Sequence, residues 1–139
     1  MNRQFPLAGL LRVRKVEHDA AVSQLGQTTA RRQATTDQRM RMAGGLAASG
    51  TDAVDAASLT AIAAARAAAG SMLAALDARE QEQRHDEQRA AEAVRDAVRR
   101  TRGIEKLETR HHDAVVAEDL RLGQIEIDEI AGRRGGERS

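Results

Sequence analysis

A single spacing runs along the first third of the chain, with alternating steps of four and three residues. It begins at Leu7 and ends at Leu46. A repeat of seven residues in this pattern is typical of a helix that packs along its length against another helix. The positions are apolar at both ends and polar in the middle: Leu7, Leu11, Arg14, His18, Ala21, Leu25, Thr28, Arg32, Thr35, Arg39, Met42 and Leu46. The pattern predicts a first helix over about 6–45.

One clear break interrupts the pattern, where Gly44, Gly45 and Gly50 lie close together. Clustered glycines favour a turn between helices, because glycine tolerates left-handed backbone conformations. We therefore expect a turn over about 44–54. Asp52 or Asp55 then caps the start of a new helix, since an aspartate side chain accepts hydrogen bonds from the first backbone N–H groups.

A second, longer helix is predicted over about 55–131. Its stretch 77–89 contains no large aliphatic residue, so it is expected to be a well-solvated part of the helix. Apolar periodicity returns from Val94 onward. The last residues, 132–139, read GRRGGERS and are predicted to form a flexible tail.

The composition excludes several classes of protein. The chain has 139 residues, which predicts a single domain over 1–139, and Phe5 is its one aromatic residue. Leu, Ile, Val and Phe together make up roughly 18% of the chain, which is too little for a thick globular core. A β-sandwich or barrel needs more β-branched and aromatic residues than this. Cysteine is absent, which excludes disulfides and thiolate metal sites.

The charges of the two predicted helices are opposite in sign. Residues 1–43 carry eight Lys and Arg against three acidic residues, a formal charge of +5, whereas 44–139 carry fourteen against eighteen, or −4. Opposite charges on two helices joined by one turn favour their folding back on each other. The predicted fold is all-α, a long two-helix antiparallel coiled coil or helical hairpin.

The sequence also bears on location. No long apolar segment precedes a small-residue cleavage site near the N-terminus, so no secretory signal is predicted. The most apolar window, Ala53 to Leu76, is mostly alanine and contains Asp55 and Arg66, and is expected to fall short of a membrane span. We expect a cytoplasmic protein.

No motif for catalysis or cofactor binding is found. The glycines match neither a phosphate-binding loop nor a dinucleotide fingerprint. His111 and His112 are adjacent, so on a helix they point about 100° apart, and a solvated or seam position is expected rather than a metal site. His18 and His111 come near each other if the helices fold back. We therefore expect no enzyme activity, no cofactor and no metal.

Two surfaces are candidates for binding other proteins. The C-terminal cluster is too wide for one helix partner, which suggests a docking site. It comprises Val115, Val116, Leu120, Leu122, Ile125, Ile127 and Ile130. The other candidate is a stripe of small and apolar residues, for which the contact between the two helices is the alternative role. It comprises Leu59, Ile62, Ala65, Ala69, Met72 and Leu76.

Three segments carry a resemblance to a known family, in the same order and over nearly the whole chain. The opening segment is FPLAGLLRVRKVEHDAAVSQLGQ, residues 5–27. The segment IEKLETRHH follows at 104–112, and QIEIDEIA at 124–131. Together they resemble the flagellar export protein family FliJ. The resemblance implies a cytosolic, non-catalytic stalk of the flagellar type III export apparatus, similar to the central stalk of rotary ATPases.

The resemblance also implies partners and binding residues. The paired chain ends would enter the hexameric export ATPase, and the other end would contact the cytoplasmic domain of the export gate protein at the inner face of the membrane. Members of the family also escort substrate-specific export chaperones. Carried onto this chain, the ATPase-binding face is Leu7, Leu10, Leu11, Arg12, Arg14, Leu120, Leu122, Ile125, Ile127 and Ile130. The export-gate stripe is Leu59, Ile62, Ala65, Ala69, Met72 and Leu76.

Two other functions stay open from the sequence. One is the equivalent stalk of a virulence type III secretion system. The other is a helical protein that binds nucleic acid through its arginines. Acidic residues are interspersed with those arginines and the formal net charge is +1, so no nucleic-acid partner is expected.

Overall fold

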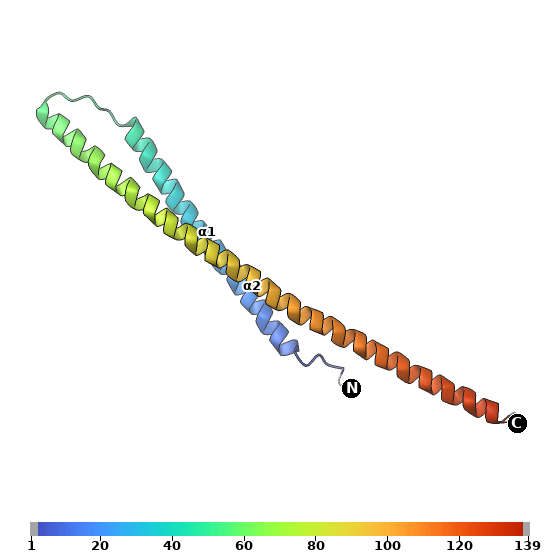
Figure 1. Cartoon of the computed structure of the whole chain (residues 1–139). Coiled ribbons are helices and arrows are strands. Elements are labelled where there is room, and N and C mark those ends of the chain that lie inside the picture. Colours follow the sequence, from blue (N-terminus) through green and yellow to red (C-terminus); the bar gives the residue numbers. More distant parts are fainter. Residues whose placement is uncertain (1–2, 138–139) are drawn as a thin grey trace. The chain divides into compact units, whose positions relative to one another are not determined.

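The computed structural model describes residues 3–137 and contains two helices within that range (Figure 1). Helix α1 spans Ala8–Ala48 and helix α2 spans Ala56–Glu137. No strand occurs among the described residues. The two helices pack against each other in opposite directions, so the predicted all-α helical hairpin is confirmed.

Within the hairpin, the contacts gather in two compact units. The first, here called the terminal unit, combines the N-terminal part of the chain up to His18 with the part from Asp96 onward. The second, the middle unit, is Asp19–Arg95. Each unit contains a segment of α1 and a segment of α2.

Ion pairs in the middle unit fix the antiparallel register. Arg32 Nε donates to Glu87 Oε2 at 2.6 Å, and Arg39 Nε donates to Glu80 Oε2 at 2.9 Å. Arg39 also lies 3.4 Å from Asp77 Oδ1. Residue numbers on α1 rise as those on α2 fall, which is the pairing that the opposite charges of the two segments predict.

The terminal unit has the same antiparallel pairing. Thr101 Oγ1 donates to the backbone carbonyl of Arg14 at 3.4 Å. Closer to the N-terminus, the ring of Phe5 lies against the ring of His111, with centroids 5.8 Å apart. The segment before α1 therefore also packs on α2.

The seven-residue spacing of α1 marks the contact face. All twelve positions from Leu7 to Leu46 are buried or half-buried, and Leu11, Thr28 and Thr35 are the most buried of them. Buried threonines keep their hydroxyls satisfied, since Thr28 Oγ1 and Thr35 Oγ1 donate to carbonyls one helical turn earlier. No described side chain is fully buried, because two helices bury only one narrow face each.

The glycine turn lies later than predicted. Gly44 and Gly45 belong to α1, which continues to Ala48, and the connection between the helices begins at Ser49. No described residue has a positive φ, so the connection needs no left-handed glycine. Helical hydrogen bonds and pairing with α2 outweigh the cost of glycine in a helix, about 1 kcal/mol per residue.

Helix α2 starts with the predicted cap. Asp55 immediately precedes α2, and its Oδ1 accepts a hydrogen bond of 2.7 Å from the backbone N–H of Ser58, the third residue of the helix. This hydrogen bond lowers the pKa of Asp55, because it favours the ionised carboxylate.

The end of α2 differs from the prediction. The helix continues through Gly132 to Glu137, so the predicted flexible tail is wrong over these residues. Its last two residues, 138 and 139, lie outside the described part of the chain. Most residues before this point are strong helix formers, and the helix propagates through the glycines because each further residue adds one hydrogen bond.

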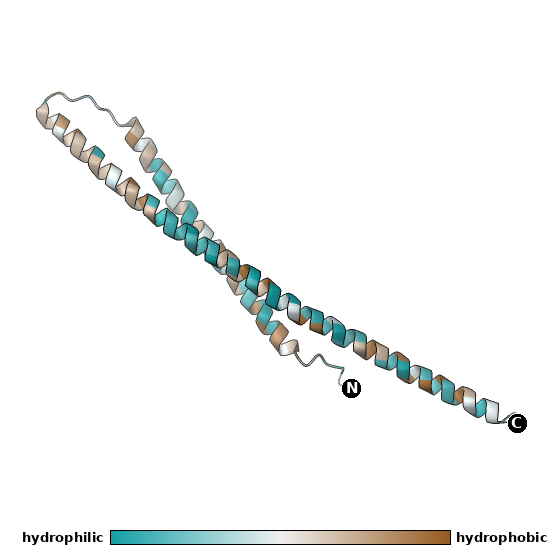
Figure 2. Cartoon of the chain, in the orientation of Figure 1, coloured by the Kyte–Doolittle hydropathy of each residue, from teal (hydrophilic) through white to brown (hydrophobic). Residues whose placement is uncertain are grey.

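The polar stretch 77–89 is not simply a solvated face. Figure 2 shows that hydrophilic residues dominate this part of α2. Glu80 nevertheless lies in the seam with its side chain only 5% exposed. Its carboxylate accepts from Arg84, Thr36 and Arg39, which replace the lost water. The prediction failed here because a buried carboxylate needs partners from both helices, and these lie far apart in sequence.

The membrane expectation also needs correction. By length and composition, α2 contains a window apolar enough to cross a membrane. The stretch from Leu59 to Leu76 is rich in alanine and interrupted by Arg66. One such helix is weak evidence for a membrane span.

Candidate partner-binding surfaces

The C-terminal part of α2 presents large aliphatic side chains to solvent. Beyond Asp119, every described residue except Gly123 is exposed. The C-terminal apolar face, as we call this set, consists of Leu120, Leu122, Ile125, Ile127 and Ile130, which are 71%, 51%, 43%, 61% and 47% exposed. At about 100° per residue, Leu120, Ile127 and Ile130 lie on one side of α2, and Leu122 and Ile125 lie on the opposite side. Exposed aliphatic side chains gathered in this way are typical of surfaces that interact with a partner.

The N-terminal residues assigned to the same face are placed differently. Leu11 is only 7% exposed, and Leu7 and Leu10 are half-buried, so these leucines help to pack α1 on α2. Arg12 is exposed, whereas Arg14 is half-buried and donates to Glu17 Oε2 at 2.9 Å. Of this N-terminal set, Arg12 alone is exposed enough to offer its whole side chain to a partner.

A contact that the sequence analysis missed holds the N-terminal segment on α2. Arg3 donates to Asp119 Oδ1 at 2.7 Å, and His111 Nε2 lies 3.3 Å from the Arg3 carbonyl. Phe5 stacks at a tilt on the same histidine. The single aromatic residue of the chain was the available signal, since its ring needs an apolar or aromatic neighbour.

Charged side chains border the C-terminal apolar face. Arg121 donates to both carboxylate oxygens of Glu118, at 3.0 and 2.7 Å. This bidentate pair lowers the pKa of Glu118 and raises that of Arg121. The ion pair lies at the N-terminal end of the C-terminal apolar face, on the side of α2 that carries Leu122 and Ile125.

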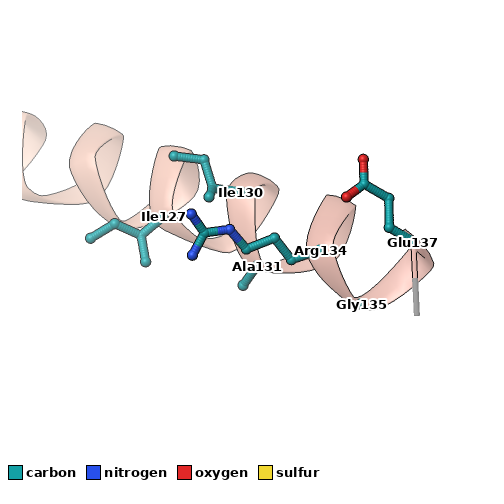
Figure 3. Close-up of a pocket in the computed structure, with 6 residues that line it drawn as sticks. All are labelled: Ile127, Ile130, Ala131, Arg134, Gly135 and Glu137. Atoms are coloured by element: carbon teal, nitrogen blue, oxygen red, sulfur yellow. The ribbon is translucent and has the colours of Figure 1, made fainter.

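A shallow hollow lies at the end of this face, and Figure 3 shows its lining. Ile127, Ile130 and Ala131 form its apolar part, and Arg134 and Glu137 its polar part. The side chain of Arg134 runs back toward the isoleucines (Figure 3), as long side chains on helices do. The hollow is open, so it suits a side chain of another protein better than an enclosed small molecule.

The export-gate stripe divides into two halves. Ile62, Ala69 and Leu76 repeat every seven residues and are buried or half-buried, so they belong to the seam. The other members, Leu59, Ala65 and Met72, are exposed. Only this second half is open to a partner.

The histidines form no metal site in the described structure. Among residues 3–137, no three His, Asp or Glu side chains are placed so that they could hold a metal ion. His111 lies against Phe5 and Arg3, whereas the register of the terminal unit places Thr101 beside Arg14, far along α2 from His111. The structure therefore does not bring His18 and His111 together.

Comparison with known proteins gives one finding. The family model described as the flagellar FliJ protein matches residues 3–139, essentially the whole chain. No curated protein and no solved structure matches this chain. Because the match spans the hairpin and both chain ends, the chain belongs to the FliJ family and is a component of the flagellar export apparatus.

Proposed function

We propose that this protein is a non-catalytic adaptor and stalk that binds the ring of the flagellar export ATPase and couples it to the export gate. The observation that carries the proposal is the C-terminal apolar face. Its five large aliphatic side chains are exposed, although the chain is otherwise poor in such residues. Burying such side chains against a partner favours binding by about 25 cal/mol per Å² of apolar surface removed from water.

The ATPase-binding face in this proposal combines the C-terminal apolar face with the N-terminal residues, which pair with α2 between Thr101 and His111. Arg12 contributes an exposed charge, and Leu7, Leu10 and Leu11 hold α1 in place. The surface of the chain mixes arginine with acidic residues, so it offers many weak contacts. Weak and distributed contacts suit a stalk that several subunits of a ring contact in turn.

The second part of the proposal concerns the gate and the chaperones. Leu59, Ala65 and Met72 are the exposed residues of the export-gate stripe and would contact the cytoplasmic domain of the gate protein. Substrate-specific export chaperones would bind the same protein. In this role the chain works in the cytoplasm, peripherally associated with the inner face of the membrane through the export apparatus.

The test is association with the purified export ATPase and stimulation of its ATP turnover. Leu122→Asp and Ile125→Asp each place a charge on the C-terminal apolar face and should weaken binding about tenfold or more. Helix content by circular dichroism should stay unchanged, since both side chains are exposed. The matched control is Val16→Asp, an exposed valine on α1 that should bind as the wild type does.

Two results would contradict the proposal. One is a wild-type chain that neither binds the ATPase nor changes its turnover. The other is loss of helix content in Leu122→Asp, because this would make the residue part of the fold. For the gate, Met72→Asp should reduce binding to the gate domain, whereas Arg79→Ala nearby should not.

A further inference from the structure

A second stripe lies on α2, on a different side from the seam. Its steps are four, three, four, three and four residues, and it consists of Val116, Leu120, Gly123, Ile127, Ile130 and Arg134. We call this set the outer stripe. At about 100° per residue, the outer stripe is centred about 100° around the helix axis from the half-buried Val115 and about 140° from His111, which contacts the N-terminal segment. The intramolecular pairing therefore leaves the outer stripe open.

The outer stripe is self-complementary when two copies run antiparallel. A coiled-coil helix has two alternating core positions. In an antiparallel pair, the first core position of one helix lies opposite the second core position of its partner. When the two-fold axis of the dimer crosses α2 at the level of Ile125, Leu120 faces Ile130 of the second copy, and Gly123 faces Ile127 of the second copy. The end position Val116 then meets the aliphatic part of Arg134, whose side chain already lies along the isoleucines (Figure 3). Large residues meet small or equal ones in every layer.

The flanking charges agree with the same register. Asp119 comes to lie beside Arg133 of the second copy, and the symmetry repeats this pair. Asp119 now contacts Arg3, whose side chain is largely exposed and can turn away. One contact is unfavourable, since Glu126 meets its own copy across the axis. This repulsion is specific to a dimer of identical chains, because a different partner protein would not place a second Glu126 opposite the first.

We propose that the outer stripe is a self-association surface on which a second copy of this chain lies antiparallel. The continuous pairing runs only from Val116 to Arg134, about nineteen residues, so the dimer is weak and forms at high chain concentration. Its layers cover Leu120, Ile127 and Ile130, three residues of the C-terminal apolar face. If the proposed function holds, self-association and binding to the export ATPase exclude each other. At high concentration, chain that is not bound to the ATPase is then dimeric.

The experiment is sedimentation of the full chain alone, from about 10 µM to about 1 mM. The wild type should change from monomer to dimer over this range. Arg133→Glu and Asp119→Arg should each weaken the dimer about tenfold, because each turns two attractive contacts into repulsive ones. An equimolar mixture of the two variants should restore association, since both contacts are then attractive again.

Two further variants test the register. Glu126→Gln should strengthen the dimer about threefold by removing the repulsion across the axis. Arg3→Ala removes the contact between Arg3 and Asp119, which competes with the contact to Arg133 of the second copy, and should not weaken association. Helix content of every variant is checked by circular dichroism, so that an unfolded variant is recognised.

Three outcomes overturn the inference: a wild-type chain that stays monomeric, open-ended assemblies in place of a dimer, or a mixture of charge variants that does not restore association. The measurement uses no ATPase. A monomeric chain that still binds the ATPase would therefore reject the dimer and keep the proposed function, whereas a dimer without ATPase binding would do the reverse.

Discussion

The middle unit and the end of the terminal unit use their residues in opposite ways. In the middle unit, charged and hydroxyl side chains occupy the seam, and Glu80 is among the most buried residues of the described chain. At the end of the terminal unit, leucines and isoleucines stand in water. Large aliphatic residues in this chain therefore do not follow burial, and the proposed binding to the export ATPase gives a reason for their exposure.

The polar seam has a physical consequence. Ion pairs such as Arg32–Glu87 and Arg39–Glu80 form in one register only, whereas alanines and leucines would pack in several. The seam of the middle unit thus determines which residues face each other. It is not fully satisfied, since the buried Oε1 of Gln83 has no hydrogen-bond partner among the described residues.

The largest expected effect separates seam leucines from exposed ones. Leu11→Ala should lower the free energy of unfolding by about 2 kcal/mol, because it removes a buried side chain. Leu120→Ala, at an exposed position of the same unit, should change it by less than about 0.5 kcal/mol. Urea denaturation followed by circular dichroism measures both. Equal losses would mean that the exposed leucine also supports the fold.

The next effect concerns the buried carboxylate. Glu80→Gln keeps the shape of the side chain but weakens its hydrogen bonds to Arg39, Arg84 and Thr36. We expect the melting temperature to fall by roughly 5 °C. The control Glu82→Gln changes an exposed neighbour and should melt as the wild type does. An unchanged melting temperature in Glu80→Gln would show that the polar seam contributes no stability.

Acid should weaken the hairpin through the same groups. Arg84 holds the pKa of Glu80 below its ordinary value, and Arg121 does the same for Glu118. A lowered pKa in the folded state gives stability above the ordinary pKa, about 4.3, which is lost as the pH falls through the lowered value. Thermal melts from pH 7 to pH 2 should show this loss, and Glu80→Gln should reduce it. A melting temperature that rises in acid would contradict the assignment.

The smallest effect is a gain. Gly44→Ala and Gly45→Ala each replace a helical glycine, and a new Cβ would meet no atom within 4 Å. Each should stabilise the hairpin by about 0.5–1 kcal/mol. Chemical denaturation measures the gain. A loss of stability would indicate that these glycines form the turn that the sequence predicts.

The sequence predicts the packing better than the ends of the elements. The spacing from Leu7 to Leu46 identified the contact face, because helix geometry alone fixes which positions share one side. It did not locate the end of α1 at Ala48 or the helical course of α2 to Glu137, since both depend on cooperative propagation of the helix.

The candidate surfaces were predicted unevenly. The C-terminal residues stand out in sequence, because their apolar pattern is wider than one seam can bury. In the export-gate stripe, Leu76 is buried in the seam and Met72 is exposed to solvent. This division depends on how α1 is aligned against α2, which cannot be read from the residues of the stripe alone. The contact of Phe5 with His111 likewise joins two distant parts of the chain.

The contact between Phe5 and His111 also determines how this protein can be observed. The chain has no tryptophan and no tyrosine, so it is almost silent in near-ultraviolet absorption and in fluorescence. A tryptophan substituted at Phe5 would be the only intrinsic fluorophore and would lie against a histidine ring. Its emission would report the docking of the N-terminal segment alone, against a dark background that few proteins provide.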